Sequence, residues 1–442
     1  MIGVNTNFEV IEKAKELGVK FIHLQFTDIG GQLKNITVPA EQMNKVLNNE
    51  ISFNGSYIGG YANVEDSDKY LYPDISTFEI VNDSMPSEAI FICDIYNADR
   101  SPFEGCPRGI LKRALSRASE SSFEFFVGAE SEFYLLKLDE KGQPTTVESD
   151  SLSYLDYNPE GVGEDVRAEM VESLRQMGFE IESSHHEIGP GQHEIVYKFS
   201  DALKAADDLI TFKQVVRAKA KKHELFASFM PKISIDMPGS GLHLNLSLFK
   251  DSINAFYDPY GQRELSTSAY KFISGIIMHS NAICAVCNPT VNSYKRIISG
   301  DFAPAYTSWS FNNRSSMIRV PSARDHATRV ELRGPDSSVH PYLAFAVLLI
   351  SGIDGIENNF AQTAYTEKNL YEMSEEMLER EGIKRMPFSL LEAIEAFEKD
   401  ECIVEFLGED IIKRYSQAKR AEWESYYNRV SDWEVGTYLK SL

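Results

Sequence analysis

Glu130 and Glu132 are separated by a single residue inside FEFFVGAESEFYLL, a stretch with the composition of a β-strand. Side chains alternate between the two faces of a strand, so both carboxylates are expected on the same face. Two neighbouring negative charges repel each other, and on a face turned toward the protein interior they are costly. A bound cation removes both difficulties, although a strand face exposed to water would also tolerate the pair.

Two more glutamates, Glu187 and Glu194, flank a Gly-Pro-Gly turn in the segment HHEIGPGQHE. Glycine and proline prevent a helix there, which excludes the HExxH arrangement of zinc peptidases. The turn can instead bring the two carboxylates together, close to the three histidines of the same segment. A polar hairpin loop without a ligand is the alternative interpretation.

The segment PGSGLHLNLSLF combines a glycine-rich turn with a strand. The two glycines would allow a ligand to approach the backbone closely. His243, Asn245 and Ser247 would then share one face of the strand. A single glycine-rich turn is weak evidence for a binding site on its own.

Arginine is concentrated between residues 313 and 336, in a chain whose formal net charge is −22. The arginines of this segment are Arg314, Arg319, Arg324, Arg329 and Arg333. In a strand, Glu331 would share a face with the last two. Guanidinium groups bind the oxygens of phosphate and carboxylate in pairs. Because apolar residues are interleaved with these arginines, we predict an anion-binding site rather than a solvated charged surface.

Carboxylates combined with clustered arginines are typical of a site for a metal ion and a nucleotide, because hard divalent cations bind carboxylates and bridge phosphate oxygens. The sequence contains no Walker A motif, no glycine-rich loop of the protein-kinase type and no GxGxxG dinucleotide fingerprint. A nucleotide would therefore have to be held in another way.

The elements that must position these residues form two groups along the chain. Residues 1–103 contain one helix and several short strands, including two around a Gly-Gly turn, and predict a small α+β domain that ends in the linker-like segment SPFEGCPRG. Residues 104–442 alternate strands with long helices and predict one large α+β domain on an antiparallel sheet. The clearest helices are expected at 164–177, 201–222, 263–285, 341–357 and 388–398.

Composition narrows the class of protein further. Hydrophobic residues make up 43% of the 442 residues, which is typical of a folded chain. The acidity argues against nucleic acid or an anionic membrane as a partner. Few cysteines, no recognisable secretory leader and no apolar stretch long enough to cross a bilayer lead us to expect a cytoplasmic enzyme. Cys284 and Cys287 lie in an apolar helical stretch, so we expect buried packing there rather than a metal or redox site.

A set of ordered motifs resembles type I glutamine synthetase. The motifs are FNGSYIGG, GAESEFYL, ESSHHEIGPGQHEI, FMPKISIDMPGSGLHLNLSLF, NPTVNSYKR, NRSSMIR and RVELRGPDSSVHPYLAFA. The resemblance covers nearly the whole chain and implies a β-grasp-like N-terminal domain, a large catalytic domain with a curved antiparallel sheet, and active sites between the subunits of a double-ring dodecamer. It also implies that ATP and two or three Mg²⁺ or Mn²⁺ ions serve to phosphorylate the γ-carboxylate of glutamate, before an amine displaces the phosphate.

The same resemblance assigns roles to individual residues. The implied metal ligands are Glu132, Glu187 and Glu194 at one site and Glu130, His243 and Glu331 at the other. Arg314 matches the arginine that stabilises the transferring phosphoryl group. The implied contacts of ATP and its phosphates are Asn245, Ser247, Arg319 and Arg329. The implied contacts of the acid substrate are Gly239, Arg296 and Arg333.

The chain departs from the family pattern where the amine would bind. Asn54 replaces an aspartate that helps bind ammonium, and an amide is neither an anion nor a base. Tyr57 replaces a serine, and Phe302 replaces the glutamate of the flap, although the adjacent Asp301 is an alternative acid. With Tyr154, these residues predict a pocket for an organic amine, because aromatic rings bind alkylammonium groups and stack on aryl rings. The positions assigned to catalysis are Arg314, Glu187, Asn54 and Phe302.

The acid side departs from the pattern as well. Pro238 stands in place of an asparagine, Asn245 in place of a histidine and Asp325 in place of a glycine. Without the asparagine side chain, the head of the acid substrate would be held differently, and a different acid is an open alternative. The retained Arg296 and Arg333 favour glutamate.

Three interpretations of the function follow. The leading one is an ATP-dependent carboxylate–amine ligase that works through an acyl phosphate, with glutamate and an organic amine as substrates. The second is an ordinary glutamine synthetase that uses Asp301 in its flap. The third is a catalytically silent homologue that serves as an assembly protein, against which the intact set of metal ligands and arginines argues.

Overall fold

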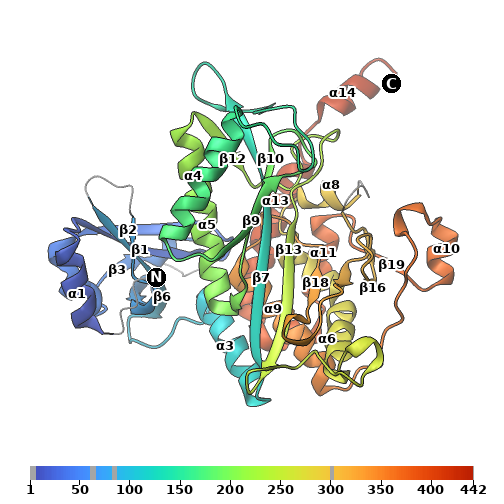
Figure 1. Ribbon diagram of the computed structural model, residues 1–442, viewed down its shortest axis with the longest axis horizontal. Coiled ribbons are helices and arrows are strands. Elements are labelled where there is room, and N and C mark those ends of the chain that lie inside the picture. Colours follow the sequence, from blue (N-terminus) through green and yellow to red (C-terminus); the bar gives the residue numbers. More distant parts are fainter. Residues whose placement is uncertain (1–5, 60–65, 82–86, 299–302, 442) are drawn as a thin grey trace.

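The computed structural model describes residues 6–59, 66–81, 87–298 and 303–441. Asp301 and Phe302, on which part of the predicted amine pocket depends, lie outside these ranges. Figure 1 shows a small N-terminal domain on one side of the long strand β7 (Glu124–Leu138) and a larger catalytic domain built around that strand. Both domains combine helices with a mostly antiparallel sheet, so the α+β class is confirmed.

The N-terminal domain is a six-stranded sheet with the strand order β2-β1-β6-β4-β3, to which β5 is added beside β6. Strands β1 and β2 form an antiparallel hairpin, whereas β1 and β6 run parallel. Gly31 has a φ of +85° in the hairpin turn, a conformation that favours glycine. The elements are α1 (Asn7–Glu16), β1 (Phe21–Thr27), β2 (Leu33–Pro39), α2 (Met43–Leu47), β3 (Ser52–Asn54), β4 (Asp68–Pro73), β5 (Glu79–Val81) and β6 (Glu88–Asn97).

The catalytic domain is built on a sheet with the order β16-β17-β18-β13-β7-β10-β9, in which every pair is antiparallel except β16 and β17. The strands around the site are β8 (Pro144–Glu148), β9 (Ile181–His186), β10 (Gln192–Tyr197), β12 (Leu225–Ser228), β13 (Leu242–Lys250), β16 (Trp309–Phe311), β17 (Ile318–Val320) and β18 (Val330–Leu332). The boundary placed by sequence after residue 103 falls between β6 and α3 and stays a prediction.

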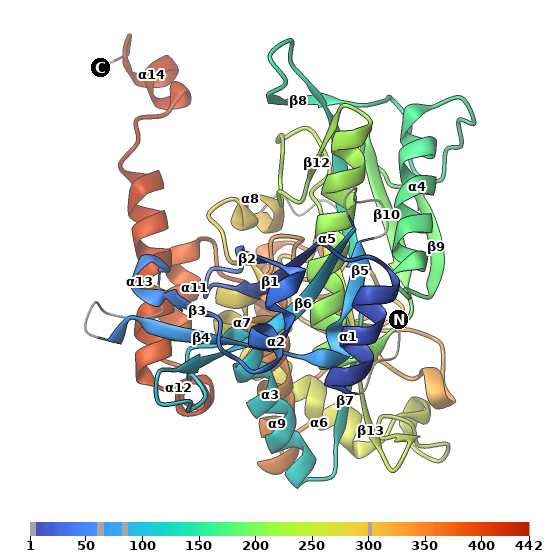
Figure 2. The ribbon, with the colours of Figure 1, turned by 90° about the vertical axis from the view of Figure 1, so that its left-hand side faces the viewer.

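Helices cover this sheet, with α9 largely buried at the centre of the core. The helices are α3 (Pro107–Glu120), α4 (Val162–Gln176), α5 (Ala202–Lys222), α6 (Thr267–Met278), α7 (Ser280–Cys287), α8 (Ser293–Ile298), α9 (Pro341–Glu357), α10 (Glu375–Arg380), α11 (Leu390–Phe397), α12 (Glu401–Leu407), α13 (Glu409–Tyr427) and α14 (Asp432–Tyr438). Figure 2 shows α14 standing away from the rest of the chain.

The single helix expected at 263–285 is wrong, because α6 and α7 meet at His279 with a bend of 75°. No glycine or proline marks the break; instead the His279 ring lies 2.7 Å from Asp400 and 3.1 Å from Asp354, which only the tertiary structure brings there. Cys284 and Cys287 are buried in the core, as expected for packing residues. Within the described ranges no single helix is long and apolar enough to cross a membrane, although the bent pair of α6 and α7 passes by length and composition.

Buried charges join the two domains. Arg108, which is 3% exposed, donates to Asp207 of α5 at 3.0 and 2.8 Å, to Asp74 at 2.9 Å and to Asp94 at 3.2 Å. Asp74 and Asp94 belong to the N-terminal domain, whereas Arg108 and Asp207 belong to the catalytic domain. A buried guanidinium that contacts carboxylates of both domains favours one orientation of the domains, because separating them would remove its contacts with Asp74 and Asp94.

Candidate active site

A cavity of about 820 Å³ opens over the middle strands of the catalytic sheet. Strand register explains why the predicted residues meet there: His243 of β13 lies opposite Glu130 of β7, and Glu194 of β10 lies opposite Glu132. All six predicted metal ligands line the cavity, as do Arg296, Arg314, Arg319, Arg333 and Gly239. Residues from five separate segments therefore face one space.

Glu187, Glu194 and His185 form one group of possible ligands, with donor atoms within 4.8 Å of one another. The His185 ring lies 3.4 Å from Glu187 and 3.3 Å from Glu194. Burial, together with the charges of Glu132 and Glu194, raises the pKa of Glu187 to about 7. The hydrogen bond to Glu194 raises the pKa of His185. The raised pKa values of Glu187 and His185 fit a site for a divalent cation, which would replace the protons of these two groups.

A second group consists of Glu130, Glu194 and His243. Burial alone would raise the pKa of Glu130, but the hydrogen bond and charge of His243 and the hydrogen bond of Asn245 lower that pKa to about 2. Asn245 donates to Glu130 at 2.8 Å, and Arg329 donates to the Asn245 carbonyl oxygen at 2.9 Å. Glu194 thus belongs to both groups, whereas the family resemblance assigns it to one site only.

Glu331 contacts two arginines. Arg333 donates to it at 2.5 Å, and Arg319 forms an ion pair with its other oxygen. Burial would raise the pKa of Glu331, but the charges of His243, Arg333 and Arg319 outweigh burial and lower it. Glu331 is therefore an anion paired with cations. Binding of a metal ion and an anionic substrate would let Glu331 and the arginines exchange partners.

The turn before β13 is held tightly against Arg296. A Cβ added at Gly239 would lie 2.7 Å from the Arg296 side chain and from the Pro231 carbonyl oxygen, so only glycine fits. Arg296 is 3% exposed and donates to the Gly334 carbonyl oxygen at 2.8 Å. The Pro238 carbonyl oxygen accepts a hydrogen bond from the Tyr134 hydroxyl at 2.8 Å. This turn presents backbone rather than side-chain groups where the family has an asparagine.

Gln192 is a site residue that sequence reasoning missed. Its side chain is buried, donates to Glu132 at 3.3 Å and to the Gly239 carbonyl oxygen at 3.2 Å, and accepts the Gly189 N–H at 3.0 Å. The Gly241 N–H also donates to Glu132, at 2.6 Å. Glu132 is therefore oriented before any ligand binds. In the sequence, Gln192 is marked only by its position between Glu187 and Glu194 in a turn. Glutamine is common in turns that have no function, so this position did not single it out.

Three of the predicted nucleotide contacts line a smaller cavity of about 200 Å³ that adjoins the first at Glu130. The three are Asn245, Ser247 and Arg329. The rings of Phe199 and His326 also line it, with centroids 6.2 Å apart, and sequence reasoning missed both. Arg319 lies in the larger cavity. The predicted phosphate contacts thus span the border between the two cavities.

The predicted amine pocket is only partly assembled within one chain. Tyr154 lines the larger cavity and packs edge-on against His185, with ring centroids 5.8 Å apart. Asn54 and Tyr57 are not among its described lining residues, and Figure 1 places β3 on the opposite side of β7 from α8. Tyr57 is 87% exposed. Asn54 caps a short 3₁₀ turn (Gly55–Tyr57): its carbonyl oxygen accepts from the Ser56 N–H at 3.0 Å and hydroxyl at 2.7 Å.

Two family models match this chain. The glutamine synthetase beta-Grasp domain matches residues 18–98, and the glutamine synthetase catalytic domain matches residues 104–438. This chain belongs to the glutamine synthetase family. It is accordingly an ATP-dependent ligase that forms amides, and enzymes of the family use ATP and divalent metal ions.

Individual relatives agree with the family. The glutamine synthetases of Staphylococcus epidermidis and Staphylococcus aureus are 44% and 45% identical over 438 residues, which is 98% of both chains. A GmaS/ADP complex superposes with a TM-score of 0.88 at 31% identity, covering 97% of this chain and 99% of that one. Plasmodium falciparum glutamine synthetase superposes with a TM-score of 0.88 at 25% identity, covering 99% of each chain.

Proposed function

We propose that this glutamine synthetase family enzyme joins glutamate to an organic amine rather than to ammonium. The observation that carries the proposal is the state of Asn54. Its carbonyl oxygen is the only group on that side chain able to attract a cation, and it already accepts two hydrogen bonds from Ser56. An uncharged, occupied amide is a poor ammonium ligand, whereas Tyr57 and Tyr154 offer aromatic rings to an organic group.

The proposed amine pocket combines two copies of the chain. Asn54 and Tyr57 face solvent in an isolated copy, and we assign them to the cavity of a neighbouring copy, as in the double-ring dodecamer of the family. Exposed apolar side chains on and after α14 support contacts between copies, since Trp433 is 66% exposed and Leu439 is 76% exposed.

The proposed reaction has two steps. A γ-carboxylate oxygen of glutamate attacks the γ-phosphorus of ATP and ADP leaves; the amine nitrogen then attacks the carbonyl carbon and phosphate leaves. Arg314 and Arg319 would contact the transferring phosphoryl group, and Arg296 and Arg333 would contact the glutamate carboxylates. That all four line the same cavity supports these roles. Mg²⁺ or Mn²⁺ held by the cavity glutamates and His243 would neutralise the phosphate oxygens. Glu187, which lines the same cavity as Tyr154, would take the proton from the attacking nitrogen.

Phosphate release from ATP and glutamate tests the proposal, with ammonium compared against a panel of primary alkyl and aryl amines. We expect turnover with organic amines and little with ammonium. The matched variant is Asn54→Asp with Tyr57→Ser, which restores the family pattern and should raise ammonium turnover relative to amine turnover. Robust turnover of ammonium by the unaltered enzyme would contradict the proposal.

Ordinary glutamine synthesis is the second candidate. The staphylococcal relatives named glutamine synthetase, at 44% and 45% identity, favour it. Turnover with ammonium that is lost in Asp301→Asn would support this candidate. No phosphate release with any amine or any acid would favour the third interpretation, a catalytically inactive homologue that serves as an assembly protein.

A further inference from the structure

Asp150 lies after β8, and its carboxylate accepts hydrogen bonds from two separate segments of the chain. Its Oδ1 accepts the Gly191 N–H at 2.8 Å and the Leu152 N–H at 3.0 Å, and the Nε2 of His186 lies 3.0 Å from the same oxygen. Gly191 and His186 belong to the turn that carries Glu187, whereas Leu152 begins the segment that carries Tyr154. One carboxylate oxygen therefore connects the two segments.

His186 extends the connection to Glu187. Its ring is 1% exposed, and its Nδ1 lies 2.7 Å from the Glu187 carbonyl oxygen. A carbonyl oxygen only accepts, so Nδ1 carries a hydrogen, and the ring bridges Asp150 to the Glu187 backbone. The backbone carbonyl of His186 accepts the Leu155 N–H at 3.1 Å, directly beside Tyr154.

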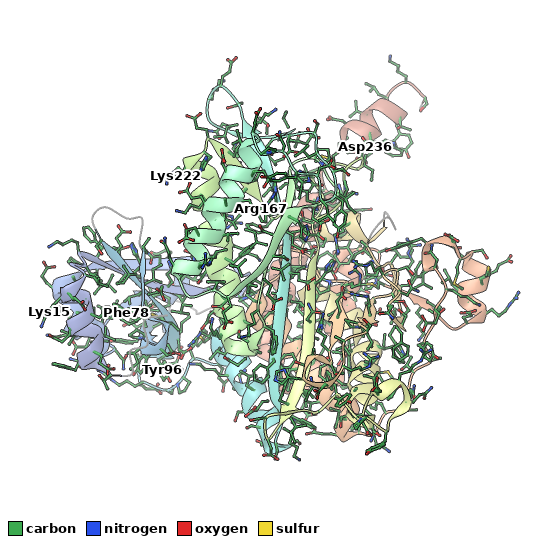
Figure 3. All side chains as sticks on the ribbon, viewed as in Figure 1. Lys15, Phe78, Tyr96, Arg167, Lys222 and Asp236 are labelled. Carbon is green, nitrogen blue, oxygen red and sulfur yellow. The ribbon has the colours of Figure 1, made fainter. Side chains whose placement is uncertain are left out.

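The cluster of Asp150, His186 and His193 is not a metal site. Arg167 of α4, labelled in Figure 3, lies 2.9 Å from the Nδ1 of His193. A guanidinium only donates, so Nδ1 accepts and the proton of this ring sits on Nε2. That Nε2 points toward Asp150 at 4.0 Å and, because it is protonated, it has no lone pair for a metal ion. The cluster is built to hold backbone segments in place.

The segment that carries Tyr154 needs such support. Leu155 has a φ of +61°, a region that residues other than glycine rarely adopt, and its side chain is 59% exposed. Packing of that side chain therefore does little to hold the conformation. Strained backbone persists only where surrounding bonds impose it. Two of those bonds reach outside the segment, from the Leu152 N–H to Asp150 and from the Leu155 N–H to His186, and two more join Ser153 and Asp156 within it.

We propose that Asp150 is a positioning residue that holds Tyr154 and the Glu187 turn in the one arrangement that accepts the attacking nitrogen. Both of these residues line the large cavity, and most contacts of ATP and of the acid lie on other strands and turns. The same turn also carries predicted metal ligands and Gln192, which contacts Gly239. Asp150 therefore acts mainly on the second step of the reaction. The inference rests on the proposed placement of the amine beside Tyr154 and Glu187, and not on which amine enters.

The test is Asp150→Asn, which keeps the size of the side chain and removes the charge that His186 faces. We expect the KM of the nitrogen substrate to rise at least tenfold, and the KM values of ATP and glutamate to rise by a clearly smaller factor. The matched control is Asp139→Asn: Asp139 also accepts two backbone N–H groups, from Lys141 and Gln143 at 2.8 Å, but in the turn between β7 and β8. Its kinetics should stay unchanged.

Hydrogen exchange provides a measurement without turnover. In Asp150→Asn the amides of Leu152, Leu155 and Gly191 should exchange faster together, while amides in the core of β13 keep their protection. An equal rise in all three KM values with a lower melting temperature would overturn the proposal. Unchanged KM values together with unchanged hydrogen exchange would also overturn it. If the unaltered enzyme prefers ammonium, the proposed function is refuted but the role of Asp150 is not. The effect of Asp150→Asn is then measured on the KM of ammonium.

Discussion

Binding of a divalent metal ion beside Glu187 should weaken when the pH falls. The pKa of Glu187 is raised to about 7 by burial and by the neighbouring glutamates, and a carboxyl must lose its proton to bind a metal ion. A group with that pKa is about 90% ionised at pH 8 and roughly 10% ionised at pH 6. The apparent affinity should therefore fall about tenfold between these values, which corresponds to about 1.4 kcal/mol.

Calorimetric titration with Mn²⁺ at pH 6, 7 and 8, in buffers of different ionisation enthalpy, measures both the affinity and the protons released. We expect close to one proton per ion from Glu187 at pH 6 and few at pH 8. The raised pKa of His185 acts in the same direction, because its proton also leaves when its carboxylate partners bind metal.

Glu187→Gln should bind Mn²⁺ more weakly and lose most of the pH dependence. The matched control is Glu180→Gln, since Glu180 pairs with Lys198 outside the cavity at 2.8 Å. An affinity that is equal at pH 6 and pH 8, or a Glu187→Gln variant with the original slope, would refute the electrostatic reasoning.

Two further substitutions test the framework around the site. Gly189→Ala places a Cβ 2.2 Å from the Tyr134 hydroxyl, which must then leave the Pro238 carbonyl oxygen. Overpacking and one lost hydrogen bond should lower the free energy of unfolding by about 2–4 kcal/mol in urea denaturation, and the KM of the acid should rise. Asp207→Asn removes the closest partner of buried Arg108 and should cost about 3 kcal/mol, with KM values unchanged.

Matched controls separate these effects from general sensitivity to mutation. Gly436→Ala, inside α14, adds a Cβ with no atom within 4 Å and should not lower the free energy of unfolding. Asp410→Asn breaks an ion pair whose aspartate is 72% exposed and should cost less than about 1 kcal/mol. A Gly189→Ala protein as stable as Gly436→Ala would contradict the steric argument. Equal losses in Asp207→Asn and Asp410→Asn would contradict the argument that a buried ion pair is costlier to break than an exposed one.

Local rules predicted the relative positions of two pairs of carboxylates correctly. The alternation of side chains along β7 places Glu130 and Glu132 on one face whatever the rest of the chain does. The Gly-Pro-Gly turn brings Glu187 and Glu194 to the same histidine. Both predictions hold because the residues involved are neighbours in sequence, so backbone geometry alone relates them.

The amino-acid sequence by itself determined the family, the two domains' fold class and the chemical types gathered for the reaction. Strand register decided that His243 faces Glu130 and that Glu194 belongs to two groups of ligands. Long-range contacts decided the break at His279 and the junction at Asp150, where no local pattern gave a signal. Such contacts join residues far apart in the chain. They contribute to stability only after folding has brought those residues together, so no local sequence pattern predicts them.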